Sequence, residues 1–134
     1  MATKKTAGNE AKELLDRLGG CSAIVLADVN GVEHRGRYTR RLVKEMEADG
    51  VTADAAIRMF DSGTLTGIEE FLERFAYPAF RAEEPGLGFD EFVEVWECQE
   101  DKTGLIETLI LLFSLPSISL VQDPTGTSQK FRLV

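Results

Sequence analysis

Apolar residues recur at helical spacing along most of the chain, so that one face of each repeating stretch is hydrophobic. Threonine or asparagine precedes several of these stretches, and glycine or proline follows them, as expected at the ends of helices. The last stretch is apolar nearly all round, which is typical of a central helix or of one that faces a partner. The predicted helices cover residues 11–18, 39–50, 53–60, 66–80, 89–98 and 105–113.

The helix over residues 66–80 has the clearest start signal. Thr66-Gly-Ile-Glu69 reads as a capping box, in which the threonine hydroxyl takes the N3 amide and the glutamate reaches back to the cap amide. Pro78 lacks an N–H and its ring clashes with the preceding turn. We therefore expect this helix to kink or restart at Pro78.

A different pattern precedes these helices. Residues 22–29 and 32–38 are separated by Asn30-Gly31, and the first of these runs is rich in β-forming residues. Asn-Gly between two such runs predicts a β-hairpin with a type I′ turn, which needs positive φ at both central residues. The predicted fold class is mainly α (α+β), with a small N-terminal β-hairpin followed by a bundle of short helices.

The length of 134 residues suits one compact domain. Within it, residues 1–20 are expected to form an N-terminal arm with a short helix, and residues 21–115 the hairpin and the helical body. Beyond Pro116 no apolar period is sustained, so residues 116–134 are predicted to be an extended or mobile tail. Ser117–Val121 is a candidate edge strand within that tail.

The composition, 43% apolar and 28% charged, is that of a soluble globular protein. The longest apolar run, Leu105–Leu115, is shorter than the roughly 20 residues of a membrane-spanning helix. Neither a secretory signal nor a lipidation motif is visible, so we expect a cytoplasmic protein with no membrane partner. A net charge of −8 repels phosphate backbones, which makes nucleic acid an unfavourable partner.

The charges are unevenly distributed along the chain. Residues 35–44 carry no acid and residues 83–101 carry no base, so the molecule is expected to be dipolar. These segments are either two solvated faces or contacts for electrostatic steering and head-to-tail self-association. The candidate electrostatic contacts are Arg35, Arg37, Arg40, Arg41, Glu91, Glu94 and Glu97.

The sequence offers little catalytic chemistry. Cys21 and Cys98 are far apart in the chain and are interpreted as free, packed thiols. His34, the single histidine, is interpreted as a surface imidazole, with a catalytic or pH-sensing role as the alternative. No calcium loop, P-loop or dinucleotide fingerprint has its required residues. We therefore predict a protein that is not an enzyme and holds no cofactor and no metal.

The aromatic residues suggest a function in binding. Most of them lie in the second half of the chain, and we expect short helices to leave part of this apolar surface exposed. A groove between the helices at 89–98 and 105–113 would accept an amphipathic helix from a partner. The candidate partner-binding residues are Phe92, Trp96, Leu105, Leu109, Leu112 and Phe113.

The order of elements resembles a known family. The hairpin of residues 28–33, the basic helix ending at 44–50, the helix of residues 71–80 and the segment Phe89-Asp-Glu-Phe-Val-Glu-Val-Trp96 carry the resemblance, which covers residues 22–115. This arrangement is similar to the tail assembly chaperones of long-tailed phages and prophages. The resemblance implies a non-enzymatic protein of the host cytoplasm, which binds the tape-measure protein, keeps it soluble and helps to recruit tail-tube subunits.

A second function fits the same sequence. The acidic segment could mask a basic client surface, as in an antitoxin-like or anti-activator adaptor. The two functions differ in what binds the client, since a chaperone uses apolar surface and a masking adaptor uses charge.

Overall fold

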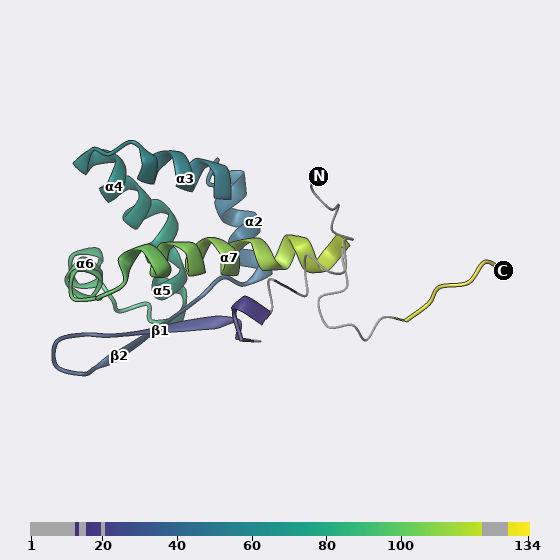
Figure 1. The fold of residues 1–134 in the computed structure, drawn as a ribbon, viewed down its shortest axis with the longest axis horizontal. Helices are drawn as coiled ribbons and strands as arrows, with labels where there is room; N and C mark the ends of the chain where they lie inside the picture. Colours follow the sequence, from purple (N-terminus) through teal and green to yellow (C-terminus); the bar gives the residue numbers. More distant parts are fainter. Residues whose placement is uncertain (1–12, 14–15, 20, 122–128) are drawn as a thin grey trace, which may run out of the picture.

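The structure is a computed structural model that describes residues 13, 16–19, 21–121 and 129–134 (Figure 1). It confirms a mainly α chain in which a two-stranded antiparallel hairpin precedes the helices. The predicted N-terminal arm before residue 11 and half of the predicted helix at 11–18 lie outside the described residues. The elements are β1 (Ala23–Ala27), β2 (Glu33–Arg37), α2 (Arg40–Ala48), α3 (Ala53–Asp61), α4 (Leu65–Phe71), a π-helical segment (Leu72–Ala76), α5 (Tyr77–Glu83), α6 (Phe89–Glu97) and α7 (Lys102–Val121).

The hairpin forms as predicted, but its turn is of another type. The carbonyl of Asp28 accepts from the N–H of Gly31 at 3.0 Å, and Gly31 has φ of +78°. Asn30 does not have positive φ, so the predicted type I′ turn is wrong. The reason is the Asp28 carboxylate, which accepts from the N–H groups of Asn30 and Val32, both at 2.9 Å, and so stabilises a wider loop.

The two helices after the hairpin begin where the sequence predicts. The Thr39 hydroxyl accepts from the N–H of Leu42 at 3.1 Å, and Thr52 makes the same bond to Ala55. These bonds satisfy amide groups that have no partner within the first turn of a helix. Gly50 follows α2 with φ of +82°, the left-handed conformation expected at a helix stop.

The next helix begins two residues earlier than predicted. Thr64, rather than Thr66, is the N-cap, and its hydroxyl accepts from the N–H of Gly67 at 3.0 Å. The predicted capping box is therefore wrong. A Cβ at Gly67 would overlap the Ser62 hydroxyl, so the absence of a side chain there lets the first turn of α4 pack against the end of α3.

The helix restarts at Pro78 as predicted, by way of a π-helical segment. Between Leu72 and Ala76 the backbone widens, and the N–H of Tyr77 bonds to the carbonyl of Leu72, five residues back. Pro78 then occupies the first turn of α5, where a missing N–H costs little. The run from α4 to α5 is thereby continuous, although its sequence contains a proline.

An aromatic cluster forms the centre of the core. The ring of Phe75 lies 5.4 Å from Tyr38, 5.3 Å from Phe71 and 5.0 Å from Phe113, measured between centroids. The Tyr38 hydroxyl is buried and donates to the carbonyl of Phe75 at 2.7 Å. Burial raises the pKa of Tyr38 well above its usual value, so the hydroxyl stays a donor. The end of β2 is thus joined to the π-helical segment.

The last helix is longer than the sequence suggests. Helix α7 continues through Pro116 to Val121, so the predictions of an extended chain from Pro116 and of an edge strand at Ser117–Val121 are wrong for these residues. The missing N–H of Pro116 removes one bond to the preceding turn, and the helix continues past it. Residues 129–134 are described without helix or strand, and residues 122–128 lie outside the description.

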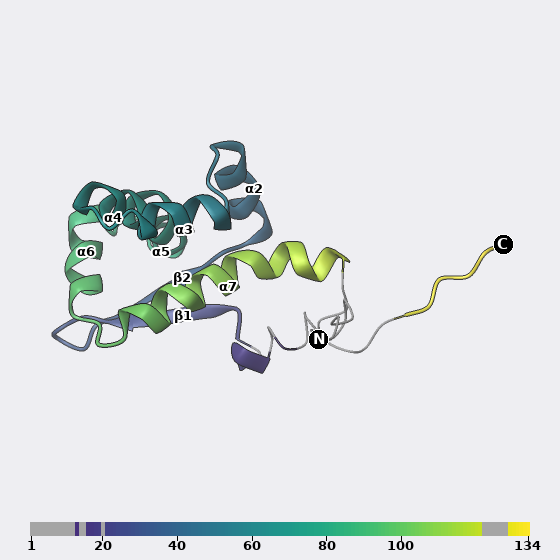
Figure 2. The ribbon, with the colours of Figure 1, turned by 45° about the horizontal axis from the view of Figure 1, so that its top comes forward.

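Helix α7 is longer than the apolar run on which the prediction of no membrane-spanning segment was based. Its 20 residues are long and apolar enough to span a membrane by length and composition, and 28% of that window is buried in the protein. The core helix of a soluble protein passes the same test. One face of α7, which includes Leu105, Leu109 and Phe113, is packed in the core. In Figures 1 and 2, α7 lies between the α3–α4 pair and the hairpin.

Candidate functional site

The residues predicted to bind a partner belong to the core. The prediction that they form an open groove between α6 and α7 is wrong, because each of them is buried. Three of them also line clefts on the surface: Trp96, Leu105 and Leu112, each in a different one. These buried residues are Phe92, Trp96, Leu105, Leu109, Leu112 and Phe113.

The prediction failed because other elements cover these side chains. The ring of Phe92 lies 5.0 Å from Phe80 and 6.1 Å from Trp96, measured between centroids. The buried residues of α7 all lie between Leu105 and Phe113, so the greater length of this helix does not account for their burial. The rings of Phe71, Phe75, Phe80 and Phe92 are all fully buried.

An apolar cleft nevertheless opens beside this core. It has a volume of about 210 Å³ and lies where α3 and α4 face α6 and α7. The side chain of Lys102 is turned away from it, because its Nζ donates to the carbonyls of Glu97 and Gln99 at 2.9 and 2.8 Å. Its methylene stem then lines the cleft. The lining residues are Phe60, Ile68, Phe71, Leu72, Trp96, Lys102, Thr103 and Ile106.

Two exposed apolar residues lie about one helical turn from residues that line this cleft, and we call these two residues its rim. Ile57 precedes Phe60 by three positions on α3, and Leu65 precedes Ile68 by three on α4, so each pair shares one helix face. Ile57 is 40% exposed and Leu65 is 73% exposed. Cleft and rim together form one surface, which we call the α3–α7 cleft.

The α3–α7 cleft suits an apolar side chain from a protein. An apolar cavity of about 150 Å³ is large enough for a benzene ring, so this one has room for an aromatic or a branched aliphatic group. No ionisable side chain except Lys102 lines it, and that ammonium group bonds elsewhere.

The predicted electrostatic contacts are all exposed, but some already have partners. Arg35 pairs with Glu83 at 3.8 Å, and Arg41 pairs with Glu45 at 3.3 Å within α2. The basic and acidic segments are thus partly paired with each other where β2 packs on α5. The exposed members are Arg35, Arg37, Arg40, Arg41, Glu91, Glu94 and Glu97.

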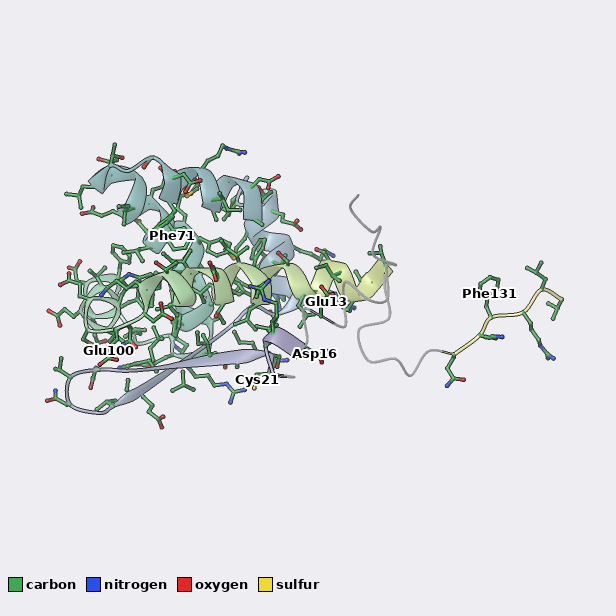
Figure 3. All side chains as sticks on the ribbon, viewed as in Figure 1. Glu13, Asp16, Cys21, Phe71, Glu100 and Phe131 are labelled. Carbon is green, nitrogen blue, oxygen red and sulfur yellow. The ribbon has the colours of Figure 1, made fainter. Side chains whose placement is uncertain are left out.

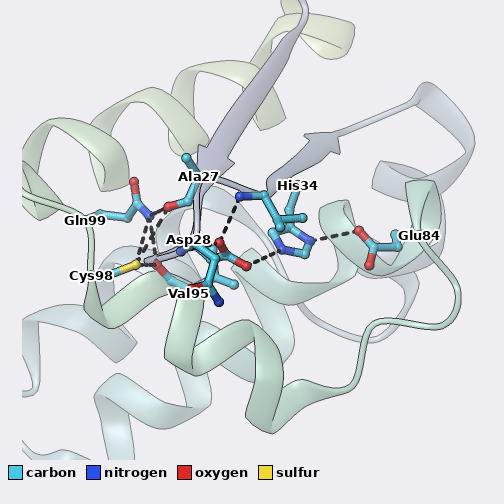
Figure 4. A network of polar contacts seen from close by, with 9 residues as sticks. Ala27, Asp28, His34, Glu84, Val95, Cys98 and Gln99 are labelled. Atoms are coloured by element: carbon cyan, nitrogen blue, oxygen red, sulfur yellow. Dashed lines mark hydrogen bonds and ion pairs between the residues drawn. The ribbon is translucent and has the colours of Figure 1, made fainter.

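His34 is buried, so the prediction of a surface imidazole is wrong (Figure 4). Its Nδ1 lies 2.9 Å from Glu84 Oε1, and its Nε2 lies 3.6 Å from Asp28 Oδ2. The alternation of β2 turns His34, Gly36 and Tyr38 inward, and this set contains no aliphatic residue. For that reason the hydrophobic pattern of this strand does not reveal which face is buried.

The two carboxylates favour the charged imidazole. The hydrogen bond to Glu84 raises the pKa of His34, burial opposes it, and the negative charges of Glu84 and Asp28 add to the rise. The backbone N–H of Val32 is the largest cause that lowers the pKa of Asp28, and His34 contributes to the same shift. Protonated His34 therefore joins the hairpin turn to the end of α5.

We expect stability to depend on pH through this histidine. Because the pKa of His34 is raised in the fold, its contribution is complete below its unfolded value of about 6.5 and is lost as the pH rises through the folded value. Urea titrations from pH 5 to 9 should show a fall in unfolding free energy that His34→Gln removes. An unchanged pH slope in His34→Gln would contradict the pairing with Glu84 and Asp28.

The two cysteines and the possible metal ligands are the remaining candidate groups. Cys21 and Cys98 are free thiols as predicted, but both are exposed rather than packed. The Cys98 thiol and the Gln99 amide both point to the carbonyl of Ala27, as Figure 4 shows. Within the described part of the chain, no group of three His, Cys, Asp or Glu side chains is arranged to hold a metal ion.

Comparisons with known protein families, with curated proteins and with solved structures found no match for this chain. The resemblance to tail assembly chaperones therefore stays a prediction from the sequence.

Proposed function

We propose that this protein is a non-enzymatic assembly chaperone of the kind found in long-tailed phages and prophages. In this role it binds the tape-measure protein, keeps it soluble and helps to recruit tail-tube subunits. The α3–α7 cleft carries the proposal, because it is an apolar surface next to a closed core. The resemblance in element order supplies the identity of the client.

The shape of the cleft suits a helical client. An amphipathic helix presents apolar side chains at i, i+3, i+4 and i+7, and such a row needs one deep pocket with apolar surface on either side of it. The cleft provides the pocket, and Ile57 and Leu65 provide the rim. A client held there would have its apolar face shielded from water, while the charged remainder of the chaperone keeps the complex soluble.

Co-expression with a long, helix-rich tape-measure protein tests the proposal. The chaperone should move this client from the insoluble to the soluble fraction. The double variant Ile57→Glu/Leu65→Glu should lose that effect, since it places two charges on the rim of the cleft. Both side chains are exposed, so the melting temperature of the variant should stay close to that of the parent.

A matched control places the same two charges elsewhere. Val29 and Val32 are exposed at the hairpin turn, away from the cleft. Val29→Glu/Val32→Glu should therefore solubilise the client as well as the parent does. Equal solubilisation by the rim variant would contradict the assignment of the cleft.

The acidic surface of α6 supports the alternative, an adaptor that masks a basic client. Glu91, Glu94 and Glu97 are exposed there. Such an adaptor would bind a basic peptide that has no apolar face, and salt would weaken this binding. It would also be insensitive to Ile57→Glu/Leu65→Glu.

A further inference from the structure

Another cleft lies where the end of β2, the start of α2 and the second half of α7 meet. Helix α2 packs against α7 in this region, and Figures 1 and 2 show the two helices side by side. The cleft has a volume of about 320 Å³, which is in the range of pockets that hold small molecules. It shares no described residue with the α3–α7 cleft, so the two sites are independent.

Two arginines that line this cleft have no acidic partner. Arg37 and Arg40 are exposed, and neither guanidinium group makes a hydrogen bond or an ion pair with a residue that the structure describes. Their neighbours Arg35 and Arg41 lie outside the cleft, and each is paired with a glutamate. No acid is among the described residues that line the cleft. Two guanidinium groups without a counter-charge are suited to bind a carboxylate or a phosphate group.

The acidic surface next to α6 lies away from this cleft. Cys21, which precedes the lining residue Ser22, and Glu100 lie at opposite ends of the hairpin in Figure 3. The five residues of β1 alone span about 16 Å, which exceeds the Debye length of about 8 Å at physiological salt. Glu13 and Asp16 lie nearer in the same view, but neither lines the cleft. The charge beside α6 therefore does not neutralise the two arginines.

The α7 side of the cleft is mostly apolar. Leu112, Leu115, Pro116 and Ser119 line it at i, i+3, i+4 and i+7, so they share one face of the helix. Leu112 is buried, and Leu115 and Pro116 are half-buried. The Ser119 hydroxyl donates to the carbonyl of Pro116 at 3.1 Å, so this polar group already has a partner. The cleft thus joins a cationic side to an apolar side.

The Thr39 hydroxyl adds a donor on the cationic side. Its oxygen accepts from the N–H of Leu42 at 3.1 Å, and its own proton stays available to an anion. The Tyr38 hydroxyl also belongs to this region, but it donates to the carbonyl of Phe75 inside the core. The donors for a ligand are therefore the two guanidinium groups and the Thr39 hydroxyl.

We propose that this cleft binds a free anionic amphiphile, a carboxylate or phosphate group that carries an alkyl chain. The head group would accept hydrogen bonds from Arg37 and Arg40, and the chain would pack on Leu112, Leu115 and Pro116. A cavity of about 150 Å³ holds the six carbons of benzene, so about twice that volume admits about twelve non-hydrogen atoms, the size of decanoate. Because the apolar surface lies within the cleft, the chain packs on protein rather than in a bilayer.

Calorimetric titration with decanoate and with decyl phosphate, below their micelle concentrations, tests the proposal. At least one of them should bind saturably, with one molecule per chain. Butyrate, which has a carboxylate but little chain, and octyl glucoside, which has a chain but no charge, should each bind at least tenfold more weakly.

Variants test the two arginines. Arg37→Gln/Arg40→Gln should weaken binding of the amphiphile at least tenfold. Both side chains are exposed and unpaired within the described part of the chain, so the melting temperature should stay close to that of the parent. The matched control is Arg41→Gln, which removes an exposed arginine outside the cleft and should leave binding unchanged.

Three results would overturn the proposal. The first is that neither amphiphile binds saturably, or that binding is indifferent to Arg37→Gln/Arg40→Gln. The second is that octyl glucoside binds as tightly as decanoate and decyl phosphate, because the site would then not recognise an anion. The third comes from sedimentation with phosphatidylglycerol vesicles. Vesicle binding that depends on the two arginines, in a protein that binds neither free amphiphile, would assign them to a membrane surface instead.

Discussion

Phe75→Ala is expected to lower the unfolding free energy by about 3–5 kcal/mol. The side chain is fully buried, and its ring contacts Tyr38, Phe71 and Phe113, so its removal leaves a cavity at the meeting point of several elements. A domain of this size has a total stability of about 5–15 kcal/mol, so the variant should be only marginally folded. The melting temperature should fall by roughly 10 °C or more.

Phe131→Ala is the matched control, because it removes the same ring from an exposed position. It should leave the melting temperature of the dilute protein unchanged. A small effect of Phe75→Ala, similar to that of Phe131→Ala, would contradict the placement of the aromatic cluster in the core.

Gly36→Ala is expected to be the second most damaging of the substitutions considered. A Cβ at Gly36 would lie 2.7 to 2.8 Å from ring atoms of Phe80, and this ring is fully buried, so it has little room to move. Overpacking of this kind typically costs about 1–3 kcal/mol. Chemical denaturation of the parent and the variant measures the difference directly.

Gly86→Ala serves as its control, because no atom lies within 4 Å of a Cβ at that position. It should change the unfolding free energy by less than about 0.5 kcal/mol. If Gly36→Ala were equally neutral, β2 would not pack on Phe80 as described.

Much of the fold is predictable from the sequence, because local signals agree with the final structure. Thr52 caps the helix that begins at Ala53, the predicted helix from Thr39 begins with Thr39 as its N-cap, and the helix restarts at Pro78. The start of α4 was misplaced because two threonines stand close together, and only the packing of Gly67 against Ser62 selects Thr64. Such packing is tertiary and leaves no periodic signal.

The candidate site was less predictable. The α3–α7 cleft depends on how helices distant in sequence face one another, and periodicity assigns apolar residues to a face without saying whether that face is closed. The burial of Phe92 depends on the rings of Phe80 and Trp96, which pack against it, and periodicity alone does not show that contact. The surroundings of His34 also escaped prediction, because Glu84 is 50 positions away in the chain.

Trp96 allows the most direct test of the central claim, that the α3–α7 cleft binds the apolar face of a helical client. It is the only tryptophan in the chain, and it lines the cleft, so its fluorescence reports on occupancy. Titration with an amphipathic helical peptide whose polar face is uncharged should change the intensity of this emission, saturably and at high salt. Ile57→Glu/Leu65→Glu should abolish this change. An emission that stays unchanged with this peptide, or that responds only to a basic peptide at low salt, would contradict the account.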